Sequence, residues 1–153
     1  MKRIIQVVIF LSIACCSYAQ MIMSAEGIMP DNICQPNTVY FLTGISAKEV
    51  KARPIESIEV IQKKLNETIS FAKENPSFEG KSAIQFAVNC NGEVGSGFHV
   101  VTKSGNGELD KELMDFFKTV TAWNAGKISK KKTVDSWYMW RLEIKDGNIT
   151  ILN

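Results

Sequence analysis

An Asn-Gly pair at residues 91–92 lies between two segments in which apolar side chains recur at every second position. The apolar positions are Ile84, Phe86 and Val88 before the pair and Val94, Phe98 and Val100 after it. This period is typical of half-buried strands, and Asn-Gly is a strong hairpin signal. We therefore predict strands over 82–89 and 94–102, joined by a three-residue loop in which Gly92 is left-handed. Even-numbered residues then pair with each other and face the core, and His99 faces the other side.

Helical periodicity replaces this alternation on both sides of the hairpin. A helix is predicted to begin at Pro54, with Ile55, Ile58, Ile61, Leu65 and Ile69 on its apolar face, and to end within 71–76. A second is predicted from about Glu108 to near Trp123, with Leu109, Leu113, Phe116, Phe117 and Val120 on its apolar face. Strands over 133–144 and 148–152 complete the pattern. This order predicts an α+β domain over 54–153, with two helices packed on one face of an antiparallel sheet.

Residues 1–19 have the three parts of a secretory signal peptide. Two basic residues precede a mostly apolar run over 4–13, and small residues just before Gln20 favour cleavage there. The run is shorter than the roughly 20 apolar residues that span a bilayer, so an uncleaved anchor is the weaker interpretation. A lipoprotein attached through Cys15 is a further alternative, less favoured because the usual leucine is missing from the residues before it.

Removal of this leader changes the charge and the cysteine content. The chain has 18 Lys and Arg against 16 Asp and Glu, and the loss of Lys2 and Arg3 makes the two sets equal. Nucleic-acid-binding proteins usually carry a marked basic excess, so we exclude that class. Cys34 and Cys90 remain, and an oxidising compartment favours a disulfide between them over two free thiols. Cys34 lies in an N-terminal arm expected over 20–53, with a short strand at 39–42.

The residue clusters that catalysis or metal binding needs are missing from the sequence. His99 is the one histidine, and the expected hairpin holds it well away from Cys90, so a thiolate–imidazole pair is not expected. A metal site needs three or four ligands at ordered spacing. The lysines at 130–132 are interpreted as a solvated loop. We therefore expect a protein that is not an enzyme and that has no cofactor and no metal.

Several short motifs follow one another along residues 79–144. They are Glu79-Gly80, the strand 84–88, Asn91-Gly92, Ser104-Gly105, Leu109-Asp110, Trp123 with Gly126, and the basic loop 127–132. Their order resembles the C-terminal domain of TonB energy-transducer proteins, and with the preceding helix the resemblance extends over 54–152. It implies a TonB-like fold in the bacterial periplasm. A cleavable leader and only 4 prolines indicate a free-standing version, without the membrane anchor or proline-rich spacer of that family.

The resemblance also implies a way of binding. In TonB C-terminal domains a long edge strand near the C-terminus pairs with an extended peptide of an outer-membrane receptor, which is strand addition. The matching strand is 133–144, and Asp135, Trp137, Met139 and Arg141 are the partner-binding residues expected on its odd-numbered face. The alternative is that Trp137 and Met139 pack under the N-terminal arm or against the last strand.

The expected partner is an envelope protein or receptor peptide, or a second copy of the chain in a homodimer. A structural or inhibitory envelope module, with the arm as its working surface, remains an alternative. A full energy transducer is a third, and it requires an uncleaved N-terminal anchor.

Overall fold

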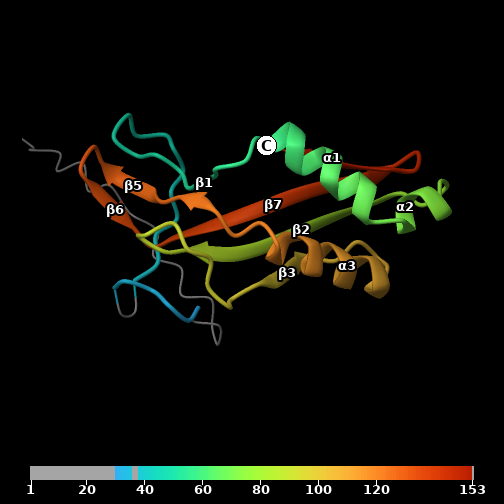
Figure 1. The fold of residues 1–153 in the computed structure, drawn as a ribbon, viewed down its shortest axis with the longest axis horizontal. Coiled ribbons are helices and arrows are strands. Elements are labelled where there is room, and N and C mark those ends of the chain that lie inside the picture. Colours follow the sequence, from blue (N-terminus) through green and yellow to red (C-terminus); the bar gives the residue numbers. More distant parts are fainter. Residues whose placement is uncertain (1–29, 36–37, 153) are drawn as a thin grey trace, which may run out of the picture.

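The computed structural model describes residues 30–35 and 38–152; the expected leader at 1–19 and the beginning of the arm lie outside these residues. A four-stranded antiparallel sheet forms the centre of the fold, in the order β3-β2-β7-β8 (Figure 1). Its strands are β2 (Gly80–Val88), β3 (His99–Thr102), β7 (Ser136–Lys145) and β8 (Asn148–Leu152). Two short pairs accompany it: β1 (Arg53–Pro54) with β4 (Trp123–Asn124), and β5 (Gly126–Ser129) with β6 (Lys132–Val134).

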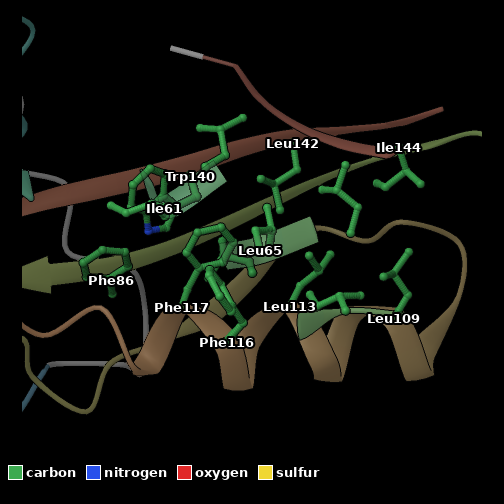
Figure 2. Close-up of a cluster of buried hydrophobic side chains, with 14 of the residues drawn as sticks. Ile61, Leu65, Phe86, Leu109, Leu113, Phe116, Phe117, Trp140, Leu142 and Ile144 are labelled. Atoms are coloured by element: carbon green, nitrogen blue, oxygen red, sulfur yellow. The ribbon is translucent and has the colours of Figure 1, made fainter. Parts of the chain in front are cut away.

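Helices α1 (Ile58–Thr68) and α3 (Gly107–Lys118) pack on the even-numbered face of the sheet, and the single turn α2 (Phe71–Glu74) follows α1. Figure 2 shows Leu109, Leu113, Phe116 and Phe117 of α3 pointing toward Trp140, Leu142 and Ile144 of β7. The rings of Phe117 and Trp140 stack with centroids 4.8 Å apart. The structure therefore confirms an α+β fold with a single face of the main sheet covered by both long helices. None of the helices in the described residues has both the length and the apolar character that a membrane crossing requires.

The first helix begins later than the sequence predicts. Ser57 is its N-cap and accepts a hydrogen bond from the Val60 N–H, so α1 starts at Ile58. Pro54 instead lies in β1, opposite Trp123. Ile55 was expected on the apolar face of the helix, but it precedes the cap and is 65% exposed.

The returning strand of the central hairpin is broken. Gly92 has a φ of +84°, as the predicted turn requires, and the turn is followed by an isolated bridge between Val88 and Val94. Regular pairing with β2 resumes only at β3, where Gln85 pairs with His99. Between the bridge and this pair, the returning segment contains two more residues than β2 does. The interrupted segment is 95–98, where Pro30 and Asp31 of the arm pack so closely on the glycines that a Cβ on Gly95 would lie 2.5 Å from the Asp31 carbonyl oxygen.

Strand β7 lies inside the sheet, which corrects the expectation of an edge strand over 133–144. β2 pairs with it along Ser136–Ile144, and β8 pairs with its other side along Arg141–Lys145. The predicted strand is also interrupted at Asp135, which separates β6 from β7. The lysines at 130–132 are exposed, as predicted, but they lie in a hairpin: the first two make the turn between β5 and β6, and the third begins β6.

Side chains of α1 cover the outer edge of β8. The Gln62 side chain accepts a hydrogen bond from the Ile151 N–H at 2.6 Å and donates to the Ile149 carbonyl. Asn66 accepts from the Ile149 N–H and donates to the Ile149 carbonyl, both at 2.9 Å. The two side chains thus occupy backbone groups that a further strand would use. At the opposite edge, no described strand pairs with the outer side of β3, where Val101 is exposed.

Candidate functional site

The four predicted partner-binding residues lie in different environments, although all of them come from the β7 region. Arg141 is exposed and Met139 is half-buried. Trp137 is only 6% exposed, because it packs with Val39 of the arm and Ala87 of β2. The expectation of a solvated face is therefore wrong for Trp137. The alternative considered from the sequence, packing under the N-terminal arm, is what the structure shows for this residue.

Asp135 was also expected to be solvated, and it is 1% exposed. Its carboxylate accepts three backbone hydrogen bonds, from the N–H groups of Cys34 at 3.0 Å, Gln35 at 2.8 Å and Cys90 at 2.9 Å. Two of these donors belong to the arm and the third belongs to the turn that follows β2. The carboxylate therefore joins three segments of the chain, and its oxygens are occupied by backbone donors.

Cys34 and Cys90 form a disulfide, as the sequence predicts. The bond lies beside Asp135, so that the two sulfurs and the carboxylate are within 4.8 Å of one another. The position of Asp135 beside the disulfide could not be predicted from the sequence, because the three residues are far apart along the chain. Both sulfurs are bonded to each other, so in this state neither is a thiolate that could hold a metal ion or act as a nucleophile.

Hydrogen bonds also join the arm to residues 89–96 of the central hairpin. Asn89 donates to the Asn32 carbonyl at 2.9 Å and to the Glu93 carboxylate at 2.8 Å. Asn32 donates to the same carboxylate at 3.0 Å. Hydrogen bonds from Asn89 and then from Asn32 lower the pKa of Glu93. The Ser96 hydroxyl donates to Asp31 at 2.6 Å.

His99 lies on the odd-numbered face, as expected. Its Nε2 is 3.0 Å from Gln85 Oε1, its Nδ1 is 3.2 Å from the Gly97 carbonyl oxygen, and its ring meets the edge of Trp137. Protein groups therefore engage both nitrogens.

The arm continues past the disulfide to the open side of β7. The short strand expected at 39–42 is reduced to one bridge, in which Tyr40 lies parallel to Ser136. The Tyr40 N–H donates to the Asp135 carbonyl at 2.8 Å, and the Trp137 N–H donates to the Tyr40 carbonyl at 2.9 Å. The next residue of β7 paired on this side is Arg141, opposite Leu152 of β8. A gap in the pairing of β7 therefore lies between Trp137 and Arg141.

Met139 is the residue whose backbone faces this gap. Successive residues of a strand direct their N–H and C=O groups to opposite sides. The Trp137 N–H points toward Tyr40, away from β2, so the groups of Met139, two residues later, point the same way. Met139 is paired with Gln85 of β2, and no described strand pairs with it on the other side.

A groove with a volume of about 550 Å³ opens at this gap. Its walls are residues 137–139 and Arg141 of β7, residues 41–42 of the arm, the segment 51–58 before α1, and Leu152. Most of the lining side chains are apolar or aromatic. The volume is within the range of roughly 300–1,000 Å³ that ligand sites occupy, so the groove can hold a short stretch of extended chain.

The polar groups of the groove are mostly hydrogen-bond donors. Lys51, Arg53 and Arg141 line it together with Tyr138. Burial raises the pKa of Tyr138 to about 12, although the nearby Arg53 guanidinium acts in the opposite direction. Its hydroxyl therefore keeps its proton throughout the physiological pH range and can donate a hydrogen bond. Tyr138 is an even-numbered residue of its strand, which alternation directs to the core face, and no sequence pattern places residues 51–53 at the same site.

Comparisons of the chain with protein-family models, with curated proteins and with solved structures found no match. The geometry of the groove and the sequence motifs are therefore the two indications of function.

Proposed function

We propose that the protein is a non-enzymatic binding module that takes up an extended segment of another envelope protein in the groove beside β7. The observation that carries this proposal is the gap in the pairing of β7 at Met139. There a backbone N–H and C=O that no described strand pairs face a groove lined mostly by apolar side chains. Backbone groups of this kind give affinity to an added strand, and the adjoining side chains give specificity.

The order of motifs along 79–144 supports the same proposal, because it resembles a family whose C-terminal domains bind receptor peptides as added strands. The resemblance and the leader-like residues 1–19 support a partner in the periplasm. The proposed contact residues are now Trp137, Met139 and Arg141, the three of the original four that line the groove. Asp135 is left out, since its carboxylate is engaged by backbone N–H groups.

Substitution of Met139 by proline tests strand addition directly. Proline has no N–H, and in this position it removes the outward donor without touching the hydrogen bonds to β2. We expect Met139→Pro to lose binding of N-terminal peptides from outer-membrane receptors, measured by NMR titration of the labelled protein. Met139→Leu keeps the N–H and should bind as the wild-type protein does.

In the wild-type protein, the shifted resonances should cluster on 41–42, 51–58 and 137–141. Shifts that cluster on the outer side of β3 instead, or equal binding by the proline and leucine variants, would show that the gap in β7 is not the binding site. A melting curve of each variant confirms that it is folded.

A second candidate is self-association through β3. Its outer edge is unpaired among the described strands and carries the exposed Val101. Two copies could pair these edges across a two-fold axis. Sedimentation of the wild-type protein and of Val101→Lys distinguishes this candidate, because a charge at the edge should favour the monomer.

A further inference from the structure

Donors outnumber acceptors among the side chains that line the groove. Lys51, Arg53 and Arg141 carry positive charge, and none of them forms an ion pair with another described residue. The one carboxylate in the lining, Glu56, is bound by Lys64 at 2.5 Å. The groove therefore has an excess of positive charge that the described part of the chain does not neutralise.

Two of the donors, Arg53 and Tyr138, line the same groove as Met139. Pro54, next to Arg53, pairs with Trp123, whose ring is 4.6 Å from the Tyr138 ring. Arg53 is close enough to Tyr138 for its charge to act on the hydroxyl. The Tyr138 hydroxyl forms no hydrogen bond with any residue in 30–35 or 38–152. Tyr138 also directly precedes Met139, so both donors flank the open backbone position.

We propose that the groove selects an extended segment carrying an acidic side chain, whose carboxylate is bound by the Arg53 guanidinium and the Tyr138 hydroxyl. The inference rests on the proposed function, because the backbone of the segment would pair with Met139. Tyr40 and Leu152 occupy this side of β7 before and after the gap, so the segment pairs with β7 at Met139 and leaves the groove on both sides. The group that we assign to the two donors is therefore a side chain of the segment and not its terminal carboxylate. Lys51 and Arg141 add attraction for the same charge.

Charge-assisted hydrogen bonds make this selection measurable. A hydrogen bond to a charged group contributes roughly 1.5–3 kcal/mol, which corresponds to a change in affinity of about tenfold or more. Replacement of the carboxylate by an amide keeps the shape of the side chain but removes the charge.

The probes are short peptides, acetylated and amidated at their ends, in which Glu or Gln stands between two apolar residues chosen from Val, Leu and Phe. We expect the wild-type protein to bind the Glu peptides about tenfold more tightly than the Gln peptides, by calorimetry at neutral pH. Arg53→Gln and Tyr138→Phe should each reduce this preference. Lys103→Gln removes a charge outside the groove and should leave it unchanged.

The possible failures are distinguishable. If Glu and Gln peptides bind equally well, the carboxylate inference is wrong and the proposed function stands. If the preference persists undiminished in both the Arg53 and the Tyr138 variants, these residues are not its source. If no peptide of the set binds, the proposed function fails and the inference fails with it. Amidation of all peptides ensures that any preference comes from the side chain, and a free C-terminus restored on the Gln peptide tests whether a terminal carboxylate can substitute.

Discussion

Asp135 shows how a single buried side chain can hold distant parts of this chain together. Its carboxylate accepts from the N–H groups of Cys34, Gln35 and Cys90, so it binds both segments that the disulfide joins. A carboxylate can satisfy several donors at once, because it has two oxygens and no proton of its own. The residue is therefore better understood as part of the scaffold than as part of a binding surface.

Substitution of Asp135 by asparagine should destabilise the fold. The amide keeps one oxygen but turns an NH₂ group toward backbone donors, which leaves at least one buried N–H without a partner. We expect a loss of roughly 2–4 kcal/mol in the free energy of unfolding, measured with urea. Asp115→Asn, which disturbs only the exposed ion pairs with Lys111 and Lys118 on α3, should change it by less than about 1 kcal/mol. Equal effects of the two substitutions would contradict the role assigned to Asp135.

The sequence alone could not reveal this role. Asp135 occupies an odd position in an alternating segment, so the local pattern correctly assigns it to the face opposite the main core. That face is covered by the arm, through contacts that are remote in sequence. The same reason explains Trp137: the alternation specifies the side of the sheet, but it does not specify whether something else packs there.

At the scale of secondary-structure elements, periodicity predicted both long helices and the face of the sheet that they cover, and the Asn-Gly pair predicted the turn at Gly92. The predicted end of the second helix near Trp123 was wrong, because α3 ends at Lys118 and Trp123 begins β4. Periodicity did not predict the points where elements begin or end, because these depend on caps and on contacts with other segments of the chain. Helix α1 starts at its Ser57 cap, and the returning strand is interrupted where Pro30 packs on Gly97. The pairing of β7 on both sides was also missed, because alternation says nothing about the neighbours of a strand.

The cover of α1 over β8 gives an element-scale prediction. Gln62→Ala with Asn66→Ala removes the hydrogen bonds to Ile149 and Ile151, at a cost of about 1 kcal/mol for each side chain. The exposed edge should also make the protein associate at high concentration, which light scattering detects. A paired control on the same helix, Lys63→Ala with Glu67→Ala, removes an exposed ion pair. It should neither lower the stability to that extent nor cause association.

At the scale of the whole molecule, the disulfide joins the arm covalently to the turn that follows β2. It links residues 56 positions apart, and the arm continues from it to Tyr40 and to the wall of the groove at 41–42. The sequence predicted the bond from the expected compartment and the cysteine count. It could not predict that the bond would lie next to Asp135 and would anchor one wall of the groove.

Removal of the disulfide should therefore weaken both stability and peptide binding. For Cys34→Ser with Cys90→Ser we expect a loss of about 4 kcal/mol in the free energy of unfolding. A reducing agent should have the same effect on the wild-type protein and none on the double variant. Unchanged peptide affinity in a double variant that remains folded would show that the arm is not needed as a wall of the groove.

The covered edge of β8 has a consequence for how copies of this protein can combine. A sheet that is open at both ends can grow by adding one copy after another, and such growth has no natural limit. Among the described strands, the outer edge of β8 is occupied by Gln62 and Asn66 and the outer edge of β3 is free. When the β3 edges of two copies pair, neither copy has a free edge left in the described part of its main sheet. Within the described part of the main sheet, association through the edge of β3 then stops at a pair, which disfavours open-ended growth into fibres.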